Sequence, residues 1–191
     1  ARRLDLEAVR EAAGRRLLLH DRDRDGHYDV VSAFIKSLRA SDPDAALYWA
    51  ARMLEAGEDP RFLGRRLMIF ASEDVGNADP AALPLAVATA QAVERVGMPE
   101  ARIPLAQAIT FLACAPKSNA AYLGMEAALE ATRRYGSAPV PLHLRNAPTA
   151  LLRELGHGRD YQYPHDAPER FVVDPNLPDA LRGTRFYEPK D

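Results

Sequence analysis

The chain has 191 residues, of which 47% are hydrophobic and 27% are charged, as in globular proteins and unlike disordered or low-complexity ones. Its formal net charge of -2 excludes a global basic field that would attract nucleic acid or an anionic membrane. The single cysteine excludes an internal disulfide framework and a multi-cysteine zinc site, and it is typical of a reducing, cytoplasmic setting. No apolar run approaches the ~18 residues that a membrane span needs.

The spacing from about Leu4 to Leu155 predicts a series of helices. Three Asp-Pro pairs, beginning at Asp42, Asp59 and Asp79, each place a capping carboxylate before a proline that suits the first helical turn. Glycines mark the expected helix ends, and alanine-rich segments allow helices to approach closely. The expected helix-ending glycines are Gly57, Gly76, Gly97 and Gly136. Apolar residues recur at helical spacing in three stripes: Val31, Phe34, Ile35 and Leu38; Phe62, Leu63, Leu67 and Phe70; and Ile103, Ala106, Ile109 and Leu112.

The sequence changes in character after Ser137. Frequent prolines make long helices improbable there, apart from a short one near Pro148 to Leu155. We therefore predict an all-α protein, a helical bundle or array, with an irregular tail that wraps the helical body. The aromatic residues expected to insert from the tail are Tyr161, Tyr163, Phe171, Phe186 and Tyr187.

The chain lacks the local motifs of common catalytic and cofactor sites. It has no Gly-Lys pair, hence no P-loop, and no dinucleotide-binding fingerprint, zinc-protease motif or serine-hydrolase elbow. No two histidines share the i, i+4 spacing of a helical metal pair. Residues Asp21 to Gly26 match the start of an EF-hand loop, but Ser32 stands where calcium requires a bidentate glutamate, which favours a polar turn. We therefore assign no catalytic, cofactor-binding or metal-binding residue.

Two segments are candidates for a functional contact. His27, Tyr28 and Asp29 precede Lys36 and Arg39 at helical spacing, beside an apolar stripe. The alternative is an ordinary capping arrangement on a solvated helix face. The second segment is the turn of Lys117, Ser118 and Asn119, in which a lysine and free backbone N–H groups suit an anion, although such a sequence is more often only a turn.

Other residues have weaker signals. The pairs Arg65-Arg66 and Arg133-Arg134 are candidates for contact with DNA, but they form no continuous stripe. Trp49, next to Tyr48, is expected to anchor a core or an interface. Cys114 is expected to be an inert buried thiol.

Several of these segments, taken in order, resemble the C-terminal region of the RarA/MgsA family of replication-associated recombination proteins. The resemblance covers nearly the whole chain from His27 onward. Its motifs are residues 27–37 (from HYD through KS), 41–49 (SDPDAALYW), 55–60 (EAGEDP), 71–76 (ASEDVG), 115–119 (APKSN), 141–148 (PLHLRNAP) and 185–189 (RFYEP).

The resemblance implies a clamp-loader-like AAA+ ATPase that acts on DNA in replication-fork maintenance, recombination and repair. Residues 1–26 would be the end of the ATPase lid and a hinge, residues 27–136 a collar-like domain that forms a homotetramer, and residues 137–191 a tail packed on it. ATP and magnesium would bind in an N-terminal motor that precedes this chain, so this part is not itself an enzyme. The implied partners are a second copy, DNA and single-stranded-DNA-binding protein, in the cytoplasm at the nucleoid and without a membrane.

The resemblance gives His27, Tyr28 and Asp29 the leading place as a contact between motor and collar, and makes the turn at Lys117 the second candidate. One alternative function is a platform that docks DNA or a protein through the arginine pairs and the aromatic tail. Another is an unrecognised enzyme that uses His143 or His165 with nearby carboxylates, which would require a deep pocket.

Overall fold

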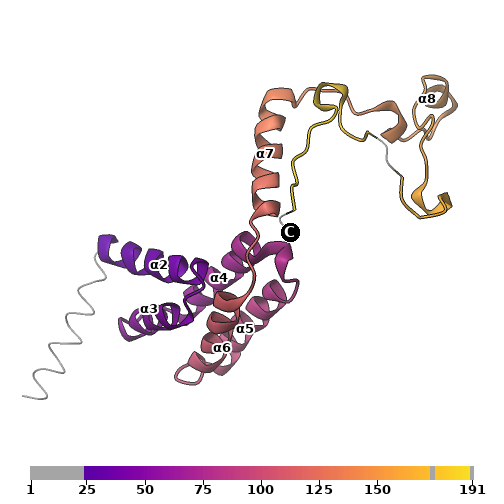
Figure 1. The fold of residues 1–191 in the computed structure, drawn as a ribbon. Helices are drawn as coiled ribbons and strands as arrows, with labels where there is room; N and C mark the ends of the chain where they lie inside the picture. The colour runs from indigo at the N-terminus through magenta and orange to yellow at the C-terminus, as the bar shows by residue number, and fades with distance from the viewer. Residues whose placement is uncertain (1–23, 173–174, 190–191) are drawn as a thin grey trace, which may run out of the picture. The chain divides into compact units, whose positions relative to one another are not determined.

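A computed structural model describes residues 24–172 and 175–189 (Figure 1). The described residues are helical or irregular and contain no strand, which confirms the all-α prediction. The chain divides into two compact units, the first reaching Tyr122 and the second comprising Leu123–Glu188. Most of the predicted lid and hinge, residues 1–26, lies outside the described residues.

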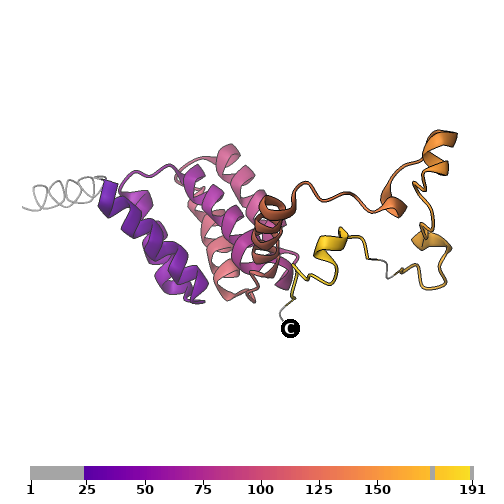
Figure 2. The same ribbon diagram turned by 90° about the horizontal axis from the view of Figure 1, so that it is seen from above.

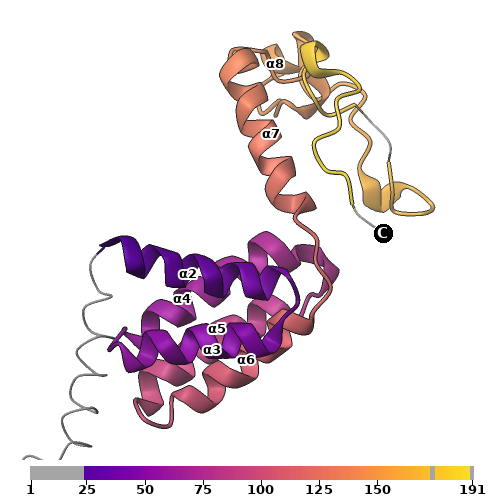
Figure 3. The ribbon, with the colours of Figure 1, turned by 60° about the vertical axis from the view of Figure 1, so that its left-hand side comes forward.

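Five α-helices form the body of the first unit. Helices α2 and α3 pack side by side, α3 also packs on α6, and α5 packs against both α4 and α6 (Figures 2 and 3). Between α4 and α5 the chain makes a π-helical turn, η1, and a short 3-10 turn, η2. The bounds are α2 Arg24–Arg39, α3 Pro43–Glu55, α4 Pro60–Phe70, η1 Ala71–Val75, η2 Gly76–Ala78, α5 Ala82–Val96 and α6 Arg102–Cys114.

The aspartate caps act largely as the sequence predicts. The Asp42 carboxylate accepts a hydrogen bond from the Ala45 N–H at 2.9 Å, directly before α3. Asp59 does the same for α4 through the Arg61 N–H, also at 2.9 Å. The prediction is wrong for the helix start at Asp79, because its carboxylate caps a preceding turn through the Ala81 N–H and α5 begins only after it.

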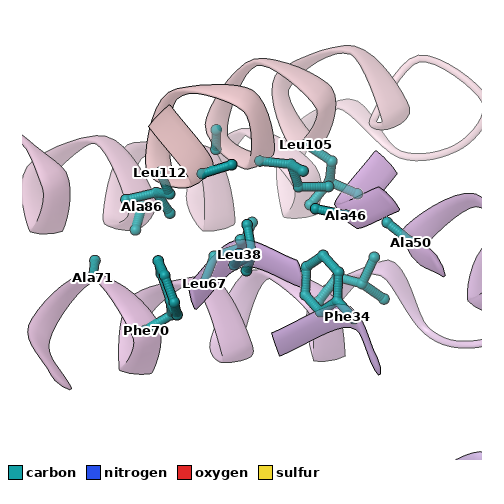
Figure 4. Packing of buried hydrophobic residues seen from close by; sticks show 14 of the residues in the cluster. Phe34, Leu38, Ala46, Ala50, Leu67, Phe70, Ala71, Ala86, Leu105 and Leu112 are labelled. Atoms are coloured by element: carbon teal, nitrogen blue, oxygen red, sulfur yellow. The ribbon is translucent and has the colours of Figure 1, made fainter. Parts of the chain in front are cut away.

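The core of the first unit contains most of the predicted apolar positions (Figure 4). Phe34, Leu38, Leu67 and Leu112 are fully buried, so truncating any of them to alanine would cost about 2–5 kcal/mol. Ile103 is a wrong assignment: 66% of its surface is exposed, because it lies on the outer side of α6. The prediction that Cys114 is buried is also wrong, because Cys114 is the last residue of α6 and is exposed.

Small residues bring the helices close together, as the alanine content predicts. Ala46 and Ala86 have no exposed surface. A Cβ at Gly64 on α4 would lie 3.3 Å from the Cβ of Ala90 on α5, which leaves no room for a larger side chain. Among the expected helix-ending glycines, Gly136 differs from the others, since Gly57, Gly76 and Gly97 have positive φ and Gly136 does not.

The second unit has one long helix, α7, which begins at the end of the first unit (Ala120–Tyr135). The predicted short helix near Pro148 is present as α8, Ala150–Glu154, which is capped by the Thr149 hydroxyl. The chain then returns along α7, and a Cβ at Gly124 would lie 2.9 Å from the Phe186 carbonyl oxygen (Figure 1). The remaining elements are the 3-10 turns η3 (Leu142–Leu144), η4 (Pro164–Asp166) and η5 (Asp179–Leu181).

Most aromatic side chains of the tail are exposed, whereas the sequence predicted that they would insert into the helical body. Phe186 is half-buried, whereas Tyr161, Tyr163, Phe171 and Tyr187 are exposed. Prolines interrupt the segment every few residues, so no helix face forms that would present these rings together.

Candidate functional site

The last residue of α2 is joined to the π-helical turn by a bidentate ion pair. The Arg39 Nε donates to Asp74 Oδ1 at 2.5 Å, and its terminal nitrogen donates to Oδ2 at 3.0 Å. A weaker contact of 3.5 Å reaches Glu73. The Asp74 hydrogen bond raises the pKa of Arg39 above its usual value, and Asp74 is only 9% exposed. The pair therefore fixes the end of α2 to an element 35 residues later.

The π-helical turn also holds the turn after α6. The Ser118 N–H donates to the Asp74 carbonyl oxygen at 2.8 Å. Gly76 follows with φ of +52°, and a Cβ there would lie 2.5 Å from the Ser118 carbonyl oxygen. Only glycine fits this approach, because both the conformation and the space exclude a side chain. Single π-helical turns are often found at functional sites.

Lys117 lies across the same junction. Its ammonium donates to the Ala113 carbonyl at 2.8 Å, to the Ala115 carbonyl, and to the Ser41 hydroxyl at 3.2 Å. Burial lowers the pKa of Lys117. The ammonium therefore stabilises the C-terminal end of α6 and is committed to carbonyls, an arrangement that does not favour the predicted anion site. We call Arg39, Glu73, Asp74, Lys117 and Ser118 the α2 junction.

The predicted residues of α2 lie at its opposite end. The His27 Nδ1 is 3.3 Å from Glu58 Oε2, and the His27 ring lies 5.7 Å from that of Phe62. Tyr28 is 68% exposed, and Asp29 is exposed too. The aromatic rings therefore connect the start of α2 with the start of α4 and leave Tyr28 available for contact.

The other predicted residues do not gather at one place. Lys36 is exposed on α2, and Asn119 is half-buried just before α7. Trp49, on α3, is half-buried and packs edge-to-face with Tyr48 at 5.0 Å. The arginine pairs are divided, with Arg65 and Arg66 on α4 in the first unit and Arg133 and Arg134 at the end of α7 in the second.

The structure thus brings together Arg39, Lys117 and Ser118 from the predicted residues, and adds Glu73 and Asp74, which the sequence analysis missed. The sequence did contain one indication for Asp74: it lies near the apolar residues Ala71 and Val75, where a carboxylate is expected to be buried and to need a positively charged partner. The spacing of residues in the sequence could not identify Arg39 as that partner, because the two residues are 35 positions apart.

Neither a metal site nor a membrane span emerges from the described part of the chain. No group of three or more potential metal-ligating side chains lies together there. None of its helices combines the length and the hydropathy required to cross a bilayer. His143 lines a pocket of about 540 Å³ in the second unit with Glu154 and Asp160, but its Nε2 lies 3.2 Å from the Asn176 side-chain oxygen rather than in contact with a carboxylate.

Comparison with known proteins gives two family matches that meet at the end of α2. Residues 1–39 match a model described as an AAA C-terminal domain, and residues 40–191 match one described as the C terminal of the MgsA AAA+ ATPase. Arg39 is the last residue of the first match, while Asp74, its partner, lies in the second.

Curated relatives from different bacteria are named replication-associated recombination protein A. The chain is 47% identical to the replication-associated recombination protein A of Escherichia coli strain K12 over 96% of its own length and 41% of that protein. It is 46% identical to that of Bacillus subtilis over 98% of its length and 44% of that protein. The chain therefore spans about two fifths of the relatives it matches, and it belongs to the MgsA family of AAA+ ATPases, whose C-terminal region it matches.

Proposed function

We propose that this chain is the homo-oligomerisation region of a DNA-dependent AAA+ ATPase that acts in replication-associated recombination and fork repair. The family match and the name of the relatives support the pathway. The nucleotide chemistry, with ATP and magnesium, would belong to the motor of the whole protein, since this chain has no Gly-Lys pair and hence no P-loop. DNA and single-stranded-DNA-binding protein would be partners of that whole protein, at the nucleoid.

The observation that carries the oligomeric role is the apolar outer surface of the first unit. Large hydrophobic side chains are exposed on three successive helices: Ile69 on α4, Leu83 and Val87 on α5, and Ile103 and Phe111 on α6. Surfaces of this kind mark interaction sites, and obligate assemblies commonly bury more than about 2,000 Å².

The solution mass of this chain, measured by light scattering after size exclusion over a range of concentrations, tests the role. A mass near four times 21.1 kDa is expected. A monomer at every concentration would contradict the proposal and would favour a platform that docks DNA or another protein.

The α2 junction supports a second part of the proposal, namely that α2 transmits motion between the motor and the helical body. A helix fixed at one end by a bidentate ion pair moves with the element that holds it. At the other end of α2 the Tyr28 side chain is exposed to solvent, and Lys36 is exposed further along the same helix.

Replacing Tyr28 and Lys36 by alanine in the full-length protein is expected to weaken the stimulation of ATP hydrolysis by DNA while the basal rate persists. The matched control is Tyr48→Ala on α3, which removes a ring of similar exposure, 60%. Unchanged stimulation in the Tyr28 and Lys36 variant would exclude this coupling route.

A further inference from the structure

The described residues contain one buried side-chain polar atom without a hydrogen-bonding partner, and it is the Nε of Arg66 on α4. The whole Arg66 side chain makes neither a hydrogen bond nor an ion pair within the part of the chain that the structure describes. Its terminal nitrogens are less buried than Nε, so the guanidinium remains open to contact from outside. Buried donors in native proteins are nearly always paired, so this one requires an explanation.

Arg66 lies on the face of α4 that meets α2. Phe62 precedes it by four residues and Phe70 follows it by four, so the three side chains share one face of the helix. The Phe62 ring lies 5.7 Å from the His27 ring of α2, and Phe70 is fully buried. Arg66 therefore interrupts an apolar stripe, where a charged group needs a partner. We call the surface between α2 and α4 at Phe62, Arg66 and Phe70 the α2–α4 seam.

The carboxylates at the two ends of the α2–α4 seam are already paired. At its start Glu58 lies 3.3 Å from the Nδ1 of His27. At its far end the α2 junction takes up both Asp74 and Glu73. No carboxylate within the described residues forms an ion pair with Arg66. Arg66 is therefore a cation without a counterion between two paired ends.

A carboxylate is the ligand that fits an unpaired guanidinium on this seam. Arginine binds a carboxylate through two parallel hydrogen bonds, as Arg39 binds Asp74 in this chain. A nucleic-acid strand fits less well, because its phosphates recur at every nucleotide and those beside Arg66 would approach Glu58 and Glu73 at the two ends. The seam therefore suits a single acidic side chain of a protein segment.

We propose that Arg66 binds an aspartate or glutamate of the AAA+ motor in the whole protein, on a motor segment that lies along the α2–α4 seam. The motor is the partner that the family match favours, because α2 forms one side of the seam and ends the match of residues 1–39 to an AAA C-terminal domain. The carboxylate meets the terminal nitrogens of Arg66 first, and rotation of the side chain then brings Nε to its second oxygen. This inference rests on the proposed coupling through α2 and assigns that coupling a second contact.

The first test compares Arg66→Met with wild type in the 191-residue chain by urea denaturation. The variant keeps an unbranched stem, loses no hydrogen bond and removes a buried N–H that has no acceptor. Its urea midpoint should therefore equal or exceed that of wild type. Arg39→Met, which breaks the pair with Asp74, is the matched control and should lower the midpoint. A midpoint that Arg66→Met lowers as much as Arg39→Met would overturn the proposal, because Arg66 would then have its partner within the chain.

The second test measures peptide-resolved hydrogen exchange in the full-length protein. Arg66→Met should raise exchange by about tenfold in a motor peptide that contains an acidic residue, as expected for the loss of a charge-assisted hydrogen bond. Arg65→Met removes the same charge from an exposed neighbour on α4 and should leave that peptide unchanged. Combining Arg66→Glu with an arginine in place of the acidic residue should restore the protection.

Other results would assign Arg66 a different role. Exchange that rises only in α2 and α4 would make Arg66 a structural residue and overturn the proposal. Unchanged motor exchange with weaker binding of a single-stranded oligonucleotide would identify DNA as the ligand, and with a lower mass in light scattering it would identify a second copy; both outcomes overturn it. If motor exchange is unchanged in Arg66→Met but the Tyr28 and Lys36 variant lowers the stimulation of ATP hydrolysis by DNA, only this contact falls and the coupling through α2 stands. If neither variant has an effect, both fall.

Discussion

Asp74 is the buried member of the pair that holds the end of α2, and its replacement tests the strength of that joint. Asp74→Asn keeps the shape but removes the charge, so we expect a loss of about 1–2 kcal/mol in the free energy of unfolding, limited by the half-exposed Arg39 partner. Urea denaturation measures it. Glu130→Gln, in the exposed pair with Arg134, is the matched control and should change stability by less than about 0.5 kcal/mol. Equal effects in both variants would contradict the role of the junction.

Gly76 tests the contact between the π-helical turn and the turn after α6. Gly76→Ala adds a Cβ 2.5 Å from the Ser118 carbonyl at a positive φ. Gly97→Ala meets the same kind of backbone strain, since its φ is +75°, but has nothing within 4 Å of the new Cβ. We expect Gly97→Ala to cost about 1 kcal/mol and Gly76→Ala about 1–2 kcal/mol more in thermal or urea unfolding. Similar losses would show that the Ser118 contact carries no constraint.

At the scale of the element, the sequence predicts the helices well where the signal is local. Asp42-Pro43 and Asp59-Pro60 combine a capping carboxylate with a fixed φ within one turn, so α3 and α4 begin where expected. The π-helical turn after α4 was not predictable, because its Asp74 is held by Arg39 and by Ser118, which come from two other parts of the chain. For the same reason the sequence indicated Arg39, Lys117 and Ser118 separately and could not place them at one junction.

The cap of α4 gives a prediction about pH. Hydrogen bonds from the Arg61 side chain, and then from its backbone N–H, hold the pKa of Asp59 below its usual value. A carboxyl group whose pKa is lower in the folded state stabilises the protein above its unfolded pKa, and this stabilisation is lost as the pH falls through the folded value.

Asp59→Asn should therefore lower the urea midpoint near neutral pH, and the difference from wild type should shrink as the pH falls from about 5 to about 2. Asp44→Asn, an acidic residue in the first turn of α3, is the control for general loss of charge. A difference between Asp59→Asn and wild type that is constant with pH would exclude the ion pair as its cause.

For the molecule as a whole, the hydrophobic core is confined to one unit. Every buried hydrophobic residue in the described chain lies between Val30 and Ala120, while in the second unit the buried positions are Gly124 and Gly156. A segment that buries so little apolar surface does not offset the conformational entropy of ordering it. Residues 123–188 are therefore expected to have a lower local stability than the first unit.

Hydrogen exchange of the 191-residue chain should consequently separate two classes of amides. We expect α4 and α6 to exchange only through global unfolding, whereas α8 and the turns around it should exchange orders of magnitude faster. The measurement is peptide-resolved exchange followed by mass spectrometry at a concentration where the chain is monomeric, and again where it is assembled. If oligomerisation supplies the missing contacts, protection of residues 137–188 should rise with assembly. Protection of α8 equal to that of α4 in the monomer would contradict the prediction, because the second unit would then have a stability that its own burial does not explain.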